Sequence, residues 1–252
     1  MSKHIGLGID IGGSGIKGAL VNLKSGEFAS KRLRIVTPVE STPTNVARVV
    51  KQIVDHFSDD INKGAVGITI PAVVTHGQTR SAANIDKSWV DCAAELLFAK
   101  ELKRDIYLMN DADAAGVAED RFGAARKVRG LVLLTTLGTG IGSAIIHNGV
   151  LVPNSELGHL QIDGVDAESR AASRIKDEEG LSYADYAKRL QRYYEVVEAL
   201  IWPDLIVVGG GISKDAAEFL PLLRLKSKIV PAKLLNTAGI VGAAVLAAER
   251  AS

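Results

Sequence analysis

The chain has 252 residues, of which 47% are hydrophobic and 23% charged, a composition typical of one or two globular domains that need no metal to build a core. Its formal net charge of +1 excludes a general attraction to nucleic acid or to an anionic membrane, so any polyanion site must be local. Cys92 is the only cysteine, the N-terminal apolar run is too short for a signal peptide, and no segment approaches the ~20 apolar residues of a membrane span. We therefore expect a cytoplasmic protein without a disulfide or a multi-cysteine zinc site.

The first predicted element is a hairpin built on glycine. An apolar run from Ile5 to Ile11 enters Gly12-Gly13-Ser14-Gly15, and a second apolar run leaves it. Gly13-x-Gly15-x-x-Gly18 matches the dinucleotide-binding pattern, but that pattern must open a helix, and a turn signal at Ser25-Gly26 follows too soon. Strand–turn–strand is the favoured interpretation. A Walker A loop is excluded because the chain contains no Gly-Lys dipeptide.

Apolar spacing predicts the elements that follow. Residues Pro43 to Phe57 have a helical period, with Thr42 or Thr44 as the cap. In chain order we predict strands at Lys31–Val36, Val66–Ile70, Asp105–Met109 and Leu205–Val208, and further helices at Asp91–Leu102, Asp113–Phe122, Tyr183–Ile201 and Ile240–Ala251.

A second glycine turn repeats the first. Gly13-Ser14-Gly15-Ile16 can be laid on Gly138-Thr139-Gly140-Ile141 without gaps, at an offset of 140 − 15 = 125 residues. The strands Val66–Ile70 and Leu205–Val208, each followed by a turn, repeat in the same order. Glycine hairpins also recur by chance, but the matching order favours a duplicated two-lobe α/β fold.

Both glycine turns are candidate phosphate sites, because backbone N–H groups can converge on an anion where no Cβ blocks the approach. Asp10, at the end of the first strand, could hold Mg²⁺ directly or through water, and Lys17 could reach a phosphate. The alternative is a plain hairpin with an aspartate–lysine pair. Gly209-Gly210-Gly211 could pass beneath a nucleotide or simply lead into a helix capped by Ser213.

Three further positions are candidates for sugar chemistry. Asp111 follows a predicted strand, where α/β sheets place functional groups, and could take the proton of an attacking hydroxyl; from sequence alone a helix N-cap is the favoured alternative. Glu156 and His159, three residues apart, can hydrogen-bond neighbouring hydroxyls of one polyol, although His159 alone would be interpreted as structural. Phosphate recognition followed by hydroxyl recognition suggests a sugar kinase.

Two basic clusters could be solvated faces or could bind along an anionic polymer: Arg121, Arg126, Lys127 and Arg129, and Arg224, Lys226 and Lys228.

Four motifs occur in the order seen in ROK-family sugar kinases, and the chain resembles that family over essentially its whole length. They are Ile9-Asp10-Ile11-Gly12-Gly13-Ser14, Asn110-Asp111-Ala112-Asp113, Leu137-Gly138-Thr139-Gly140-Ile141-Gly142 and Glu156-Leu157-Gly158-His159. The resemblance implies a duplicated two-lobe actin-like ATPase (ribonuclease-H-like) fold with its active site in the interlobe cleft. The predicted lobes are residues 1–109 plus 240–252 and residues 110–239.

The region after Glu156-Leu157-Gly158-His159 lacks the cysteine cluster that commonly binds zinc in this family, and resembles a zinc-free actinobacterial branch that phosphorylates glucose from polyphosphate. The resemblance implies polyphosphate and/or ATP as donor, Mg²⁺ but no zinc, and a homodimer. It implies Asp111 as base and, as glucose ligands, Asn84, Asn110, Asp111, Glu156, His159 and Glu168. Taken alone, Asn84 looks like a loop residue and Glu168 like part of a solvated charged stretch. The predicted phosphate set is Asp10, Gly12, Gly13, Ser14, Lys17, Gly138, Thr139, Gly140, Gly209, Gly210 and Gly211.

Two alternatives stay open. One is an ATP-only glucokinase or another hexose kinase on the same scaffold. The other is a sugar-sensing regulator of the same family; those proteins add a DNA-binding domain before the first hairpin, whereas here the first strand is expected to start at Ile5.

Overall fold

The computed structural model describes residues 4–61, 64–82 and 85–251, and its contacts divide into two compact units. The first unit comprises Met1–Ala118 and Thr237–Ser252, and the second comprises Glu119–Asn236. The lobe boundaries expected from the sequence, at residues 109 and 239, remain predictions. Residues just beyond 109 belong to the first unit because Ala114 packs with Met109 and Ala243 in one small apolar cluster.

The first unit contains a mixed five-stranded sheet in the order β3-β2-β1-β4-β7. The predicted glycine hairpin is confirmed: its two strands pair antiparallel up to Gly12 and Gly15, so Gly13 and Ser14 form the turn. β1 also pairs with β4, and β4 pairs with β7, and both of these pairings are parallel. The strands are β1 (Ile5–Gly12), β2 (Gly15–Asn22), β3 (Leu33–Ile35), β4 (Val66–Ile70) and β7 (Ile106–Asn110), with a small separate pair, β5 (Val74–Thr75) and β6 (Gln78–Thr79).

The helices of the first unit follow the predicted pattern with shifted ends. Of the two predicted caps, Thr42 and Thr44, it is Thr42 whose side chain caps the helix, by accepting a hydrogen bond from the N–H of Asn45. The helix predicted from Asp91 begins only at Ala94, because Asp91 has a φ of 54° and cannot be helical. The helices are α1 (Pro43–His56), α2 (Ser58–Ile61), η1 (Lys87–Trp89), α3 (Ala94–Leu102), α4 (Asp111–Phe122), whose last residues enter the second unit, and α9 (Ala238–Arg250).

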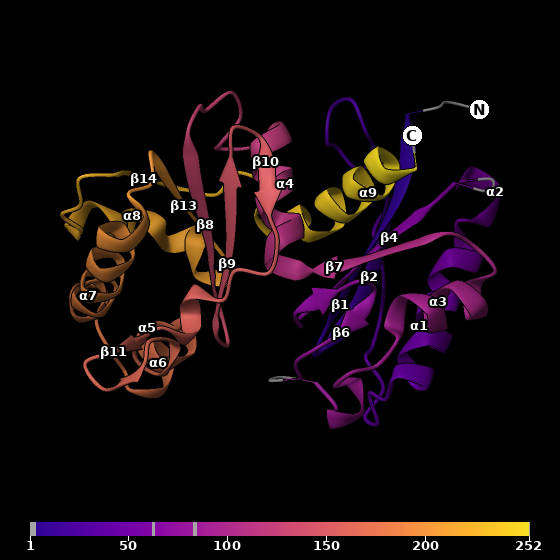
Figure 1. The fold of residues 1–252 in the computed structure, drawn as a ribbon, viewed down its shortest axis with the longest axis horizontal. Helices are drawn as coiled ribbons and strands as arrows, with labels where there is room; N and C mark the ends of the chain where they lie inside the picture. The colour runs from indigo at the N-terminus through magenta and orange to yellow at the C-terminus, as the bar shows by residue number, and fades with distance from the viewer. Residues whose placement is uncertain (1–3, 62–63, 83–84, 252) are drawn as a thin grey trace. The chain divides into compact units, whose positions relative to one another are not determined.

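The C-terminal helix packs against the first sheet through glycines. In Figure 1, α9 lies on one side of the first sheet, with α1 and α3 together on the other. A Cβ added at Gly8 would overlap the backbone carbonyl of Ile240, and one added at Gly67 would overlap that of Ala243. The missing side chains therefore allow backbone-to-backbone approach on this face. The larger apolar side chains of the sheet form the core with α1 and α3 on the opposite face.

The second unit repeats the sheet. Its strand order, β10-β9-β8-β13-β14, corresponds position by position to that of the first sheet, which confirms the duplication. One difference concerns the turn: Leu137 pairs with Ile141, so three residues, Gly138 to Gly140, close this hairpin where two close the first. The strands are β8 (Leu131–Leu137), β9 (Ile141–His147), β10 (Val150–Val152), β13 (Leu205–Gly209) and β14 (Lys228–Pro231).

The helices of the second unit cover this sheet with an apolar face. The longest, α7 (Tyr183–Ile201), has the predicted bounds; Ser182 caps it, and Trp202, with a φ of 47°, ends it before Pro203. Among the residues that the structure describes, no helix is long and apolar enough to cross a membrane. The remaining elements are η2 (Leu157–His159), β11 (Gln161–Ile162), β12 (Val165–Asp166), α5 (Glu168–Ala171), α6 (Ser173–Glu178), η3 (Gly211–Asp215), α8 (Ala216–Phe219), η4 (Leu220–Leu222) and η5 (Leu235–Thr237).

Candidate active site

Asp10 and Lys17 meet across the first hairpin. They are direct partners in the β1–β2 register, and the Lys17 ammonium lies 3.3 Å from Oδ2 of Asp10. The other carboxylate oxygen accepts a hydrogen bond of 3.1 Å from the hydroxyl of Thr69, which is its partner in β4. Both charged side chains keep about a quarter of their surface exposed, at 27% and 22%. The structure thus holds one oriented, accessible carboxylate beside a cation and next to the glycine turn.

Two side chains from later in the chain hold the glycine turn by hydrogen bonds. The Arg34 guanidinium donates to the carbonyl oxygen of Ser14 at 2.7 Å, and the Thr37 hydroxyl donates to that of Gly12 at 2.6 Å. Both contacts use carbonyl groups, while Gly13 and Ser14 are exposed. The exposed side of the turn is therefore open to a ligand, as the phosphate prediction requires.

The structure separates the roles of Asn110 and Asp111. The side-chain oxygen of Asn110 accepts from the N–H groups of Ala112 and Asp113, at 2.8 and 3.1 Å, so Asn110 is the N-cap of α4. Interpreting Asp111 as the cap was wrong: Asp111 is the first residue of the helix, and its carboxylate accepts a hydrogen bond of 2.9 Å from the adjacent N–H of Ala112. Asn110 is buried and also donates to the carbonyl of Ala72. Its capping role leaves the partly exposed Asp111 carboxylate at the end of the strand.

In the second unit, Glu168 lies against the second glycine turn. Its carboxylate accepts a hydrogen bond of 3.1 Å from the N–H of Ile141, and a Cβ added at Gly140 would collide with it. The interpretation of this residue as part of a solvated charged stretch is therefore wrong. Arg174 supports the same turn by donating from Nε to the carbonyl of Thr139 at 3.0 Å.

Glu156 and His159 lie close together, with 3.9 Å between Nε2 of the histidine and Oε2 of the glutamate. The other ring nitrogen, Nδ1, lies 3.0 Å from Oδ2 of Asp166. One polar atom from each of His159, Asp166 and Glu168 lies within 4.8 Å of the other two, so the three side chains form one cluster. The cluster continues from the Glu156–His159 pair to the glycine turn.

The pKa values of Glu156 and His159 are both raised above their usual ranges. Partial burial raises the pKa of Glu156 above its usual range; the neighbouring His159 lowers it in part, and the charge of Glu168 raises it further. The hydrogen bond that His159 donates to the Asp166 carboxylate is the largest cause that raises the pKa of His159. Burial opposes that rise, and the carboxylates of Glu168, Asp166 and Glu156 add to it.

Sequence reasoning missed Asp166 and Thr69. Asp163 and Gly164 both have positive φ, at 53° and 79°, and form the turn between β11 and β12. This Asp-Gly pair is a typical hairpin signal and could have placed Asp166 beside the preceding histidine. Thr69 could have been found as the one hydroxyl in an otherwise apolar strand.

The remaining predicted residues are located as follows. Gly209 ends β13, Gly210 has a φ of 83°, and Gly211 is exposed at the start of η3. Ser213 does not cap a helix but donates to the carbonyl of Gly210 at 2.7 Å. Asn84 lies outside the described residues. The basic side chains of both clusters are exposed, except that of Arg121, which is partly buried and contacts Asp120 and the carbonyl of Gly149.

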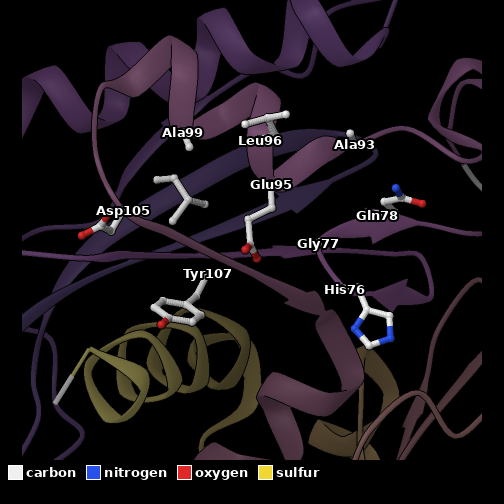
Figure 2. Close-up of a pocket in the computed structure, with 10 residues that line it drawn as sticks. His76, Gly77, Gln78, Ala93, Glu95, Leu96, Ala99, Asp105 and Tyr107 are labelled. Carbon is white, nitrogen blue, oxygen red and sulfur yellow. The ribbon is translucent and has the colours of Figure 1, made fainter.

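A cavity of about 520 Å³ lies elsewhere in the first unit, between the β5–β6 turn and α3 (Figure 2). Its wall includes His76, Gln78, Glu95 and Tyr107. The Glu95 carboxylate already accepts from the N–H of Leu108 at 3.0 Å. Among the described residues, none of the predicted site residues lines this cavity.

The two repeated sheets, each with a glycine hairpin, and the acid–histidine cluster beside the second turn are those of a sugar kinase with the two-lobe actin-like ATPase fold. The family model for the "ROK family" matches residues 6–178, and the chain belongs to this family. It is 49% identical over 245 residues to a polyphosphate glucokinase of Mycobacterium tuberculosis, covering 97% of this chain and 91% of that protein.

Two solved structures extend the comparison. An inorganic polyphosphate/ATP-glucomannokinase from Arthrobacter sp. strain KM superposes with a TM-score of 0.92 at 50% identity, covering 98% of this chain and 99% of that one. A ROK family glucokinase from Streptomyces griseus, in complex with glucose and AMPPNP, superposes with a TM-score of 0.80 at 23% identity, covering 97% and 99%. The second likeness shows the shared fold.

Proposed function

We propose that this protein is a glucokinase that moves the terminal phosphoryl group of polyphosphate to the 6-hydroxyl of glucose, giving glucose 6-phosphate. One observation carries the proposal: the Glu168 carboxylate accepts a hydrogen bond from Ile141 at the second glycine turn and lies within 4.8 Å of polar atoms of His159 and Asp166. A site for an anion and a site for hydroxyl groups therefore adjoin. The relatives that are about half identical to this chain bear the names of polyphosphate-dependent sugar kinases.

Glucose is held by hydrogen-bonding side chains in this proposal. Glu156 and His159 hydrogen-bond adjacent sugar hydroxyls, which their facing side chains permit. Glu168 supplies a further acceptor, and Asn110 contributes through the amide hydrogen that the carbonyl of Ala72 does not use. Asn84 stays in the proposed set as a prediction from family resemblance.

Asp111 is the proposed general base. Because Asn110 caps α4, the Asp111 carboxylate is not needed as the cap and can accept the proton of the 6-hydroxyl. The hydroxyl oxygen then bonds to the terminal phosphorus, while the bond from that phosphorus to the bridging oxygen of the donor breaks. The shortened polyphosphate leaves with the electron pair of that bond.

The two glycine turns and Lys17 hold the phosphates of the donor. Their backbone N–H groups and the ammonium group oppose the charge of the transferred phosphoryl group. Asp10 fits a magnesium ion, because Mg²⁺ in kinases is usually held by one or two carboxylates together with phosphates and water, and this carboxylate is accessible and already oriented by Thr69. Bound there, Mg²⁺ would add positive charge next to the phosphoryl oxygens. Zinc has no role in the proposal.

Polyphosphate is proposed as the preferred phosphoryl donor, and ATP as a donor that the enzyme uses less efficiently. The polymer would extend along exposed lysines and arginines of the second unit, for which the clusters at 121–129 and 224–228 are the candidates. With ATP, the segment Gly209 to Gly211 would lie next to the nucleoside. A cytoplasmic location and a homodimer belong to the same proposal.

Parallel assays test the function. Purified protein is given glucose or mannose with either ATP or long-chain polyphosphate, and the 6-phosphate is measured by a coupled dehydrogenase. We expect glucose 6-phosphate with polyphosphate, at a higher kcat/KM than with ATP. Product with ATP alone would establish the ATP-only alternative, and no product with any pair would reject a hexose kinase.

A further inference from the structure

We propose that Asp166 is the positioning residue of the sugar site, which sets the orientation of His159 and links it to the second glycine turn. Two contacts support this role. One oxygen of its carboxylate lies 3.0 Å from Nδ1 of His159, and the other accepts from the N–H of Glu168 at 3.2 Å. The Glu168 carboxylate in turn accepts from the N–H of Ile141. A continuous path of hydrogen bonds thus runs from the histidine ring to the turn.

The contact selects one form of the histidine. A carboxylate can only accept, so Nδ1 must carry the hydrogen, and Nε2 is left for another partner. That nitrogen lies on the side of Glu156, 3.9 Å from its carboxylate. Neutral His159 therefore offers an acceptor there and protonated His159 a donor, and either can meet a sugar hydroxyl.

Apart from the N–H of Glu168, the backbone around Asp166 is held by contacts that do not use its carboxylate. The hairpin register pairs Asp166 with Gln161, and the N–H of Ala167 donates to the carbonyl of Leu160 at 2.9 Å. The hydroxyl of Ser169 donates to the backbone carbonyl of Asp166 at 2.6 Å. Removal of the carboxylate should therefore release the histidine ring while the hairpin stays folded.

The electrostatic effect agrees with the geometry. Hydrogen bonding to Asp166 is the largest contribution that raises the pKa of His159, and Glu168 and Glu156 are the other charged groups that face the ring. With Asp166 neutralised, two of the three acidic groups remain. The pKa of His159 should then fall toward its usual value without losing all of the shift.

The inference rests on the proposed function only for the identity of the sugar. The test compares Asp166→Ala and Asp166→Asn with the matched control Asp163→Asn. Asp163 lies on the same hairpin, but its carboxylate pairs with Arg192 at 2.7 Å, away from the histidine. Kinetics with glucose give kcat and KM, NMR titration of the histidine ring signals gives the pKa, and His159→Gln identifies the signal.

We expect Asp166→Ala to raise the KM for glucose about 10-fold or more with a smaller change in kcat, since a charge-assisted contact is lost. Asp166→Asn should recover part of the KM, because an amide oxygen can still accept from Nδ1. The pKa of His159 should fall in both variants and stay unchanged in Asp163→Asn. An unchanged glucose KM and an unchanged His159 pKa in Asp166→Ala would overturn the inference. A protein without kinase activity whose His159 pKa still falls in Asp166→Asn would reject the proposed function and retain the inference.

Discussion

Replacing Gly140 by alanine should disturb sugar binding without unfolding the protein. The added Cβ would lie 3.1 Å from Cδ of Glu168 and closer still to Oε2, so the carboxylate must retreat by roughly 1 Å. The obstacle is the far end of a flexible side chain, and Gly140 does not have a positive φ, so the backbone can keep its conformation. The melting temperature should therefore stay close to that of the wild type.

The magnitude follows from the contact that is lost. The hydrogen bond between the N–H of Ile141 and Glu168 is 3.1 Å long, and a bond to a charged group is worth about 1.5–3 kcal/mol. Its loss, together with displacement of a proposed sugar ligand, should lower kcat/KM for glucose about 10- to 100-fold. Steady-state kinetics with glucose varied at saturating polyphosphate measure this change.

Gly138→Ala is the matched comparison. Its added Cβ meets no protein atom within 4 Å, so Glu168 and the KM for glucose should be unaffected. In a double-mutant cycle with Glu168→Gln, Gly140→Ala should cost much less than it does in the wild type, because both changes act through the same side chain. Additive effects, or a Gly140→Ala enzyme that loses affinity only for polyphosphate, would refute the reasoning.

Three further predictions concern the base, the acid and the fold. Asp111→Asn should lower kcat about 10²–10⁴-fold while calorimetry still detects glucose binding; near-normal turnover would reject the base assignment. Because the pKa of Glu156 is raised, this side chain should become protonated at a higher pH than an ordinary glutamate does as the pH falls, and its protonation should raise the KM for glucose. A Glu156→Gln enzyme whose KM for glucose rises in the same way at low pH would contradict this. Gly67→Ala should destabilise the first unit by about 1–3 kcal/mol, because the added Cβ would overlap the Ala243 carbonyl. Gly13→Ala is the control, since a Cβ at Gly13 has open space around it. Equal denaturation midpoints for the two variants would argue against the packing at Gly67.

Local signals in the sequence determined the repeated architecture. The glycine turns at Gly13 and Gly138, their flanking apolar runs and the offset between them predicted two equivalent hairpins, and the two sheets have the same strand order. The helix ending before Pro203 was also predicted correctly, and Thr42 is one of the two caps predicted for the first helix, because caps and breakers act within a few residues. Such features depend on neighbours in the chain, which a single sequence displays.

Only the tertiary structure decided which polar side chains belong together. Glu168 looked solvated in sequence, yet it reaches a turn 27 residues away, at Ile141. The hydroxyl of Thr69 reaches Asp10 across a separation of 59 residues, through a parallel pairing whose register no local pattern specifies. Asn110 and Asp111 are both suitable caps by residue type, and the direction in which the chain enters α4 selected Asn110. Contacts between distant segments depend on strand register and helix direction, and the packing of the whole unit sets both.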